Sequence, residues 1–197
     1  MLKIGITGGI GSGKTTVSRI FETLGIPVFY ADLVAKEVMV KDPLLIAGVR
    51  EAFGAESYSD ERLNTKHIAG IVFNDAIELA KLNALVHPAV FRAFDQWLEN
   101  LARKPPYILK EAALLFESGS YKMCDKSLLV TAPLEMKLQR VMQRDNATAE
   151  QVKARIDKQF TDEQKTLMAD YSIVNDETKS LVLQVLDLHH RFLNAQL

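Results

Sequence analysis

The sequence contains very little cysteine and no apolar run long enough to cross a bilayer. Cys124 is the single cysteine among 197 residues, which excludes an internal disulfide and a cysteine-rich metal site. We interpret it as a small, partly buried side chain. The N-terminal segment has the pattern of a core strand rather than of a signal sequence. We therefore expect a cytoplasmic protein that has no membrane partner.

A strong charge of either sign is also missing. The chain carries 24 basic and 25 acidic residues, for a formal net charge of -1, which argues against a nucleic-acid partner bound through a wholly positive surface. The length and the hydrophobic fraction of 48% are typical of one compact domain with room for a lid or an insertion. We expect small-molecule substrates and a monomeric protein, although the sequence does not exclude an oligomer.

A phosphate-binding loop is present near the N-terminus. Leu2, Ile4 and Ile6 predict a strand, and residues 8–16 read Gly-Gly-Ile-Gly-Ser-Gly-Lys-Thr-Thr, which matches G-x-x-x-x-G-K-[ST]. The alternative is a glycine-rich turn that binds no ligand, but the predicted strand before it and the predicted helix after it favour a phosphate-binding loop. Backbone amides of such a loop converge on a phosphate. We assign triphosphate binding to Gly9, Gly11, Ser12, Gly13, Lys14, Thr15 and Thr16.

Two side chains of this loop carry chemistry. Lys14 supplies a mobile cation for the β- and γ-phosphates, and the Thr15 hydroxyl occupies the position that binds Mg²⁺ in such loops. The helix that begins at about Gly13 directs its positive end at the same anion. The loop alone leaves open whether water, a small molecule or a protein receives the phosphoryl group.

An aspartate follows the second predicted strand, residues 28–31, directly. The carboxyl ends of parallel strands line the ligand crevice of an open α/β sheet, so we expect Asp32 at the same edge as the loop. It is either a base, or an orienting group, for the hydroxyl that attacks the γ-phosphate. Alternatively it is the N-cap of a helix that begins at Leu33, and both roles are compatible.

The segment 33–103 shows no convincing strand. It contains amphipathic segments at 34–40, 45–53, 68–73 and 77–101, whereas one crossover helix would suffice between two parallel strands. A helical insertion that sets acceptor specificity is therefore predicted. His87-Pro88 interrupts the longest segment, so His87 either contacts an acceptor phosphate or bonds to a carbonyl freed at the kink.

The second half of the chain predicts three more strands. Residues 107–109 begin the third strand, which could extend past Glu111 through 112–116 to Glu117. Glu117 then holds a metal-bound water or the acceptor, or it is a surface carboxylate. Strands are also predicted at 127–131 and 171–175, and a last helix contains His189 and His190, which we expect at the surface.

Arg140 and Arg144 lie one helical turn apart. A planar guanidinium can bond two phosphate oxygens at once, and further basic residues follow up to Gln159. We predict a mobile lid over about 146–164, although the nearly equal number of acidic residues also fits an ordinary salt-bridged helix.

Taken together, these residues resemble the dephospho-CoA kinase family along nearly the whole chain. The resemblance rests on the loop, Ala31-Asp32-Leu33, Val72-Phe73, His87-Pro88, Leu114-Leu115-Phe116-Glu117, Arg140 with Arg144, Arg155 with Gln159, and Asn175. It implies transfer of the γ-phosphate of ATP to the ribose 3′-hydroxyl of dephospho-CoA, with Mg²⁺, as the last step of coenzyme A synthesis.

Residues and resemblance imply an α/β fold of the P-loop NTPase, nucleotide-kinase-like kind. It has three layers, a five-stranded parallel sheet, a helical substrate-binding insertion and a lid. The implied core is about 1–32, 105–145 and 165–197, the CoA-binding subdomain 33–104 and the lid 146–164. The implied site consists of catalytic Asp32, Lys14 and Arg140, further ATP ligands Arg144 and Asn175, the acceptor ligands Asp32, His87, Leu115 and Glu117, and Thr15 on Mg²⁺.

Four positions depart from the family pattern. Tyr30 replaces the first carboxylate of Asp-Ala-Asp, Thr65 and Ala113 replace an arginine and a proline, and Glu177 replaces the glycine expected two residues after Asn175. Two other functions compete. A nucleoside or nucleoside monophosphate kinase would share the loop, whereas a nucleotide-dependent switch lacks support because Asn-Lys-x-Asp and Asp-x-x-Gly motifs are absent.

Overall fold

The computed structural model describes residues 1–59, 62–73 and 75–194. The chain forms two compact units, one made of Met1–Tyr30 with Arg103–Leu197 and the other of Ala31–Ala102. The predicted insertion, 33–104, differs from the second unit by two residues at each end. The chain leaves the first unit after Tyr30, the last residue of the second strand, and returns to it at Arg103, a few residues before the strand that begins at Tyr107.

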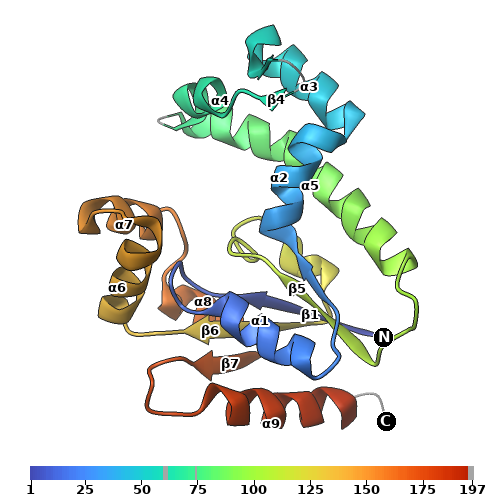
Figure 1. Cartoon of the computed structure of the whole chain (residues 1–197), viewed down its shortest axis with the longest axis vertical. Coiled ribbons are helices and arrows are strands. Elements are labelled where there is room, and N and C mark those ends of the chain that lie inside the picture. Colours follow the sequence, from blue (N-terminus) through green and yellow to red (C-terminus); the bar gives the residue numbers. More distant parts are fainter. Residues whose placement is uncertain (60–61, 74, 195–197) are drawn as a thin grey trace. The chain divides into compact units, whose positions relative to one another are not determined.

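A five-stranded parallel sheet forms the centre of the first unit (Figure 1). Its order is β2-β5-β1-β6-β7, so β5 lies between β1 and β2. All four ladders are parallel, which places the carboxyl ends of the strands at one edge. The strands are β1 (Leu2–Thr7), β2 (Val28–Tyr30), β5 (Tyr107–Glu111), β6 (Lys126–Thr131) and β7 (Tyr171–Val174).

The sequence predicted all five strands, but the extension of β5 through 112–116 is wrong. β5 ends at Glu111, where its neighbour β1 also ends and turns into the loop. The chain then forms turns, in which the Ser118 amide donates to the Leu114 carbonyl at 2.9 Å. An apolar run without a partner strand cannot continue the ladder.

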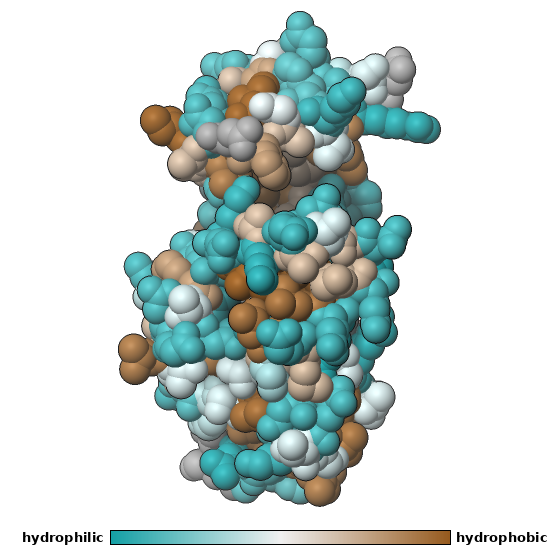
Figure 2. Space-filling view, turned by 90° about the vertical axis from the view of Figure 1, so that its left-hand side faces the viewer, coloured by the Kyte–Doolittle hydropathy of each residue, from teal (hydrophilic) through white to brown (hydrophobic). Residues whose placement is uncertain are grey.

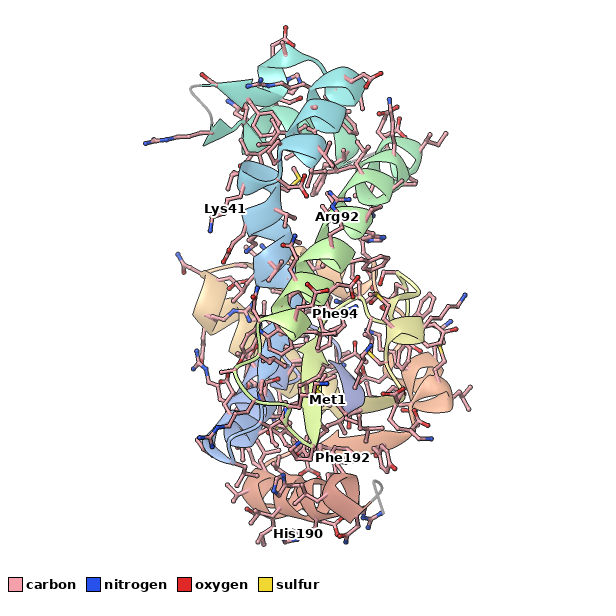
Figure 3. All side chains as sticks on the ribbon, turned by 90° about the vertical axis from the view of Figure 1, so that its right-hand side faces the viewer. Met1, Lys41, Arg92, Phe94, His190 and Phe192 are labelled. Carbon is pink, nitrogen blue, oxygen red and sulfur yellow. The ribbon has the colours of Figure 1, made fainter. Side chains whose placement is uncertain are left out.

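Two helices cover one face of the sheet, α1 (Lys14–Thr23) and α9 (Leu181–Asn194). Alternate residues of β1, Ile4 and Ile6, point to this side and are fully buried. The Tyr107 and Phe192 rings meet edge to face, 5.3 Å apart between centroids. Figure 3 labels Phe192 and His190 on α9, and His190 is exposed as expected.

The expectation of a surface position is wrong for His189. Its Nδ1 lies 2.6 Å from the Tyr107 hydroxyl oxygen, and the side chain is half-buried. Burial lowers the pKa of this imidazole and raises that of the Tyr107 phenol. The periodicity of α9 identified its buried face, but the contact of its His189 with Tyr107 of β5 is a tertiary feature.

The other face of the sheet packs against the segment after β5. A Cβ at Gly5 would lie 2.7 Å from Leu115 Cδ2 and 3.1 Å from Cys124 Sγ, so glycine leaves the space that these side chains fill. Leu115 is fully buried, and Cys124 is half-buried as expected. Burial raises the pKa of the Cys124 thiol to about 11, which keeps this cysteine protonated and unreactive.

Three helices complete the first unit, α6 (Leu134–Asp145), α7 (Ala149–Ile156) and α8 (Asp162–Met168). Leu138 and Val141 of α6 form a small separate core with Val152 of α7. Hydrophilic side chains cover most of the molecular face in Figure 2, with hydrophobic patches between them. Within the described part of the chain, no helix combines the length and apolar character that a bilayer crossing requires.

The second unit contains the four helices that the sequence predicted. They are α2 (Ala31–Lys41), α3 (Pro43–Phe53), α4 (Thr65–Val72) and α5 (Ala76–Glu99). A short 3-10 helix (Ala55–Ser57) and a hairpin of β3 (Tyr58–Ser59) with β4 (Arg62–Leu63) were not expected. Strands of two residues are too short to show an alternating pattern.

Pro88 lies inside α5 and does not end it. This agrees with the prediction of one helical segment over 77–101, and packing of α5 on α2 and α3 offsets the loss of one backbone donor at Pro88. Arg92 of α5 pairs with Asp42, the N-cap of α3, at 2.6 Å (Figure 3). Although partial burial opposes ionisation, the Leu45 amide and the Arg92 guanidinium hold the pKa of Asp42 below its ordinary value.

Asp42 thus stabilises the second unit in a pH-dependent way. We expect Asp42→Ala to lower the free energy of unfolding by about 1–2 kcal/mol at pH 7, through loss of the cap and of the ion pair. Because the folded-state pKa is depressed, the contribution is present above the unfolded pKa and is lost as the pH falls through the folded value. Urea unfolding between pH 7 and pH 2 should show the two proteins converge in acid. Asp42→Asn, which retains a cap, separates the two contributions, and a constant difference at all pH values would contradict this account.

Candidate active site

The loop between β1 and α1 requires glycine at two positions. Gly11 and Gly13 have φ angles of 80° and 95°, a left-handed conformation that other residues adopt at a cost. A Cβ at Gly11 would lie 2.5 Å from the Lys137 carbonyl oxygen, and one at Gly13 would clash with Asn175 Nδ2. The backbone of α6 and the side chain after β7 therefore enclose the loop.

The loop and the start of α1 present donors to an anion. Gly13 is the N-cap of α1 and has no side chain to bond the first-turn amides, which leaves them for a bound oxyanion. Lys14 Nζ donates to the carbonyl oxygens of Gly8 at 2.9 Å and of Gly9 at 3.4 Å. These bonds hold the ammonium group at the loop itself.

Thr15 is joined to a carboxylate that the sequence analysis did not assign to the site. Its hydroxyl donates to Glu111 Oε1 at 2.9 Å. Glu111 is only 7% exposed, and its Oε2 is buried without a hydrogen-bond partner among the residues that the structure describes. An orphaned carboxylate oxygen beside a hydroxyl is a donor set that suits a hard cation such as Mg²⁺.

A signal for Glu111 existed in the sequence but was not sufficient. Glu111 is the last residue of β5, just as Asp32 lies two residues after the end of β2. Only the sheet order shows that β5 is a neighbour of β1, with Glu111 opposite Ile6. Within the described ranges, no group of three histidine, cysteine or acidic side chains could hold a metal by itself. A cation at Thr15 and Glu111 would therefore complete its shell with phosphate oxygens and water, as Mg²⁺ commonly does.

Asn175, the residue directly after β7, holds the loop at Ser12. Its Nδ2 donates to the Ser12 carbonyl at 2.8 Å, and its backbone amide donates to the Thr131 carbonyl of β6 at 2.8 Å. The Asn175 carbonyl accepts from Arg140 Nη1 and Nη2 at 3.3 and 3.4 Å. The structure thus brings together three predicted site elements: the loop, Arg140 and Asn175.

Arg144 points to other partners. Its guanidinium pairs with Asp145 at 2.7 Å and 3.1 Å, and Arg155 reaches the same carboxylate at 2.7 Å. These two arginines, Arg144 first, lower the pKa of Asp145 to about 2. All three side chains lie near the surface, and a role for Arg144 in ATP binding stays a prediction.

The segment predicted as a lid contacts the loop directly. Gln159 Oε1 accepts from the Ile10 amide at 3.0 Å. Lys137 of α6, nearly fully buried, pairs with Asp162 at 2.8 Å, close above Gly9. A cavity of about 540 Å³ lies between these groups and residues 156–163. Motion of this segment stays a prediction.

Glu117 bonds to Phe160 of the same segment and to Lys165 of α8. Its Oε1 lies 3.0 Å from Lys165 Nζ and accepts from the Phe160 amide at 2.9 Å. Lys165 is fully buried and also donates to the Ala113 carbonyl at 3.3 Å. The side chain of the neighbouring Leu115 packs under the sheet. Roles for Glu117 and Leu115 in acceptor binding stay predictions.

The remaining two predicted site residues belong to the second unit. Asp32 lies exposed in the first turn of α2, which begins at Ala31, so the alternative of an N-cap for a helix starting at Leu33 is wrong. His87 is half-buried within α5 and stacks on Phe91 with ring centroids 6.3 Å apart. Their approach to the loop stays a prediction.

Comparison with known proteins extends along nearly the whole chain. A model of the dephospho-CoA kinase family matches residues 2–180. The dephospho-CoA kinase of Bacteroides fragilis (strain YCH46) is 38% identical over 187 residues, which cover 95% of this chain and 91% of the relative. The crystal structure of TT1252 from Thermus thermophilus is 35% identical, covers 100% of this chain and 97% of its own, and has a TM-score of 0.83. Dephospho-CoA kinase from Campylobacter jejuni is 26% identical, with 99% and 98% covered and a TM-score of 0.68.

Glu177 offers a test of the loop that carries Asn175. Its φ of 65° is unusual for a residue with a Cβ, and its carboxylate pairs with Arg140 at 3.1 Å. Glu177→Gly and Glu177→Ala both remove the ion pair, but only glycine relieves the backbone. We expect the glycine variant to be more stable than the alanine variant by about 1 kcal/mol in urea unfolding. Equal stabilities would show that this loop does not hold the left-handed conformation.

Proposed function

Because the chain belongs to the dephospho-CoA kinase family, we propose that the phosphate loop, Asp32 and Arg140 together carry out its phosphoryl transfer. The activity is transfer of the γ-phosphate of ATP to the ribose 3′-hydroxyl of dephospho-CoA, which yields CoA and ADP in the final step of coenzyme A synthesis. The match of residues 2–180 to one family carries this conclusion. It sets aside the nucleoside kinase and switch alternatives.

The triphosphate binds at the loop and at the first turn of α1. The uncapped amides of that turn bond the β-phosphate, because Gly13 offers them no side-chain partner and its left-handed backbone is the kind that such loops use to direct amides at an anion. Lys14 exchanges its bonds to the Gly8 and Gly9 carbonyls for phosphate oxygens. The ammonium group then follows the charge that moves toward the β–γ bridge in the transition state.

Thr15 and Glu111 hold the magnesium ion. Bound Mg²⁺ supplies charge neutralisation at the β- and γ-phosphate oxygens. The Thr15 hydroxyl would be a ligand, and Glu111 would either bind the ion or orient one of its waters through Oε2, which has no partner among the described residues. The buried position of Glu111 keeps this carboxylate fixed, which limits reorganisation when the nucleotide binds.

Asp32 accepts a hydrogen bond, and finally the proton, from the 3′-hydroxyl of the acceptor. Support comes from chain connectivity. β2 is separated from β1 by one strand, and strands lie about 4.8 Å apart. Asp32 follows the last residue of β2 by two positions, which limits their Cα separation to about 7 Å. The carboxylate therefore starts from the sheet edge that carries the loop.

Arg140 stabilises the phosphoryl group during transfer, and Asn175 lies beside the adenine. Support comes from the bonds that already orient the Arg140 guanidinium through the Asn175 carbonyl, because a fixed donor costs little to align. Arg144 joins the phosphates if it leaves Asp145. We further propose a cytoplasmic monomer in which residues 146–164 close over the substrates and exclude water.

Replacement of Asp32 tests the central step. We expect Asp32→Asn to lower kcat by about 10²–10⁴-fold, because the amide cannot take the proton, and to leave the Kd for ATP nearly unchanged. ADP production is measured with dephospho-CoA, with nucleosides and with nucleoside monophosphates as acceptors. Glu37→Gln, which removes an exposed carboxylate of the same helix that pairs with Lys41 at 3.1 Å, is the matched control. Unchanged turnover in Asp32→Asn would remove this residue from the chemistry.

Replacement of Glu111 tests the magnesium site separately. Glu111→Gln preserves an acceptor for the Thr15 hydroxyl but removes the charge, so we expect the Mg²⁺ concentration for half-maximal activity to rise about 10–100-fold. Glu135→Gln, at an exposed position in the first turn of α6, serves as the control. An unaltered magnesium dependence would show that Glu111 has a structural role only.

A further inference from the structure

One residue between β7 and α9 has a backbone conformation that its type rarely adopts. Glu177 has a φ angle of 65°, and in the described part of the chain Asn146 is the other non-glycine residue with a positive φ. Asparagine is among the residues that enter this region most readily, whereas a glutamate there costs about 1–2 kcal/mol. Strained residues of this kind cluster at functional sites, so the contacts of Glu177 need an explanation.

The rest of the connection between β7 and α9 (Figure 1) maintains the conformation of Glu177. Before it, Gln184 of α9 bonds both the amide and the carbonyl of Val174, each at 2.9 Å. Around it, the Asp176 carboxylate accepts from the Thr178 amide at 3.0 Å and from the Thr178 hydroxyl at 2.7 Å. The backbone on both sides of Glu177 is therefore tied down, and the fold imposes the left-handed conformation.

The side chain of Glu177 bonds to Arg140 of α6. Its Oε1 accepts from Arg140 Nη2 at 3.1 Å. The Asn175 carbonyl, two residues earlier in the same connection, accepts from Nη1 and Nη2 at 3.3 and 3.4 Å. Two acceptors thus fix one end of the guanidinium. The Nε–H group and one hydrogen of Nη1 have no partner among the residues that the structure describes, so these donors can bond a phosphate.

Stability does not account for this ion pair. The Glu177 side chain is 72% exposed and that of Arg140 is 29% exposed. Exposed ion pairs contribute about 0.2–1 kcal/mol, which is no more than the left-handed conformation costs, about 1–2 kcal/mol. The pair therefore does not offset the strain of the residue that provides it. What the pair does provide is a fixed direction for the guanidinium.

We propose that Glu177 is a positioning residue, which holds the Arg140 guanidinium in the orientation that meets the transferring phosphoryl group. This inference rests on the proposed function of Arg140. A donor that is already oriented stabilises the charge of the transition state with little reorganisation. The family pattern has a glycine at this position. The carboxylate support is thus a feature of this chain, beyond the residues that the resemblance assigns.

The charge of Glu177 gives this role a distinctive kinetic effect. A carboxylate close to the phosphates opposes binding of the triphosphate, whereas its hold on Arg140 favours turnover. Removal of the carboxylate should therefore lower kcat without raising the Kd for ATP. A merely structural support would weaken binding and turnover together. Because the carboxylate is exposed, salt screens its effect on binding.

Two substitutions of Glu177 separate orientation from charge. Glu177→Gly removes the carboxylate and relieves the backbone, so the variant should fold at least as stably as the parent. We expect it to lower kcat about 3–10-fold and to lower the Kd for ATP by up to about 3-fold at low salt. Glu177→Gln keeps an oxygen for Nη2, so its kcat should stay within about two-fold of the parent value. Asp187→Ala, which removes an exposed carboxylate paired with Arg191 at 3.0 Å on α9, is the control and should change neither quantity.

A double-mutant cycle and a spectroscopic measurement complete the test. In an Arg140→Ala background, Glu177→Gly should have no further effect on kcat, because the positioned group is gone. The side-chain N–H signals of Arg140 in ¹⁵N NMR should be separate from those of exposed arginines in the parent and in Glu177→Gln, and should merge with them in Glu177→Gly.

The outcomes distinguish this inference from the proposed function. An unchanged kcat in Glu177→Gly, the same loss of kcat in both backgrounds, or a raised Kd for ATP would overturn the positioning role, while a low kcat in Arg140→Ala would leave the proposed function intact. Arg140 signals that stay separate in Glu177→Gly would overturn it as well. If these signals merge as expected but Arg140→Ala retains full kcat, Glu177 does position the guanidinium and the proposed function of Arg140 is wrong.

Discussion

The hydrogen bond from Asn175 to the Ser12 carbonyl is the constraint on which the candidate site depends. It brings the side-chain amide of Asn175 so close to Gly13 that a Cβ at position 13 would not fit. The same asparagine bonds β6 through its amide and Arg140 through its carbonyl. A single buried residue, through its side chain and its backbone, therefore joins the loop, the end of β6 and the Arg140 guanidinium.

Two carboxylates, one at the end of β5 and one six residues later, have different surroundings and, by our proposals, different roles. Glu111 is bonded to the Thr15 hydroxyl of the phosphate loop and retains one oxygen without a partner in the described part of the chain, a combination that suits a ligand to a cation. Glu117 Oε2 is likewise buried without a partner among the described residues, but its Oε1 is paired with the fully buried Lys165 and accepts from the Phe160 amide, far from the Thr15 hydroxyl in the hydrogen-bond network. Breaking a buried ion pair of this kind by removing one partner is strongly destabilising. Glu117 thus anchors the segment that reaches the loop through Gln159, whatever else it contacts.

The two units divide the proposed task in a way that follows from their construction. The parallel sheet supplies a rigid edge with the loop, Glu111 and the end of β2. The helical unit begins at Ala31, directly after β2 ends at Tyr30, and α2 carries Asp32 in its first turn. By our proposal, the base that accepts the proton is therefore carried by the first helix of the inserted unit.

The sequence by itself determined the elements whose signals are local. The loop motif, the five strands and the four helices of the second unit follow from residue spacing, because periodicity and turn chemistry act over a few residues. It failed where partners come from distant segments. Glu111 was treated as part of an apolar run, and His189 was placed at the surface. Only the tertiary structure decided that Glu111 meets Thr15 and that Tyr107 reaches His189. The reason is that these outcomes depend on which strands and helices become neighbours, and neighbour choice is a property of the whole fold rather than of any short window.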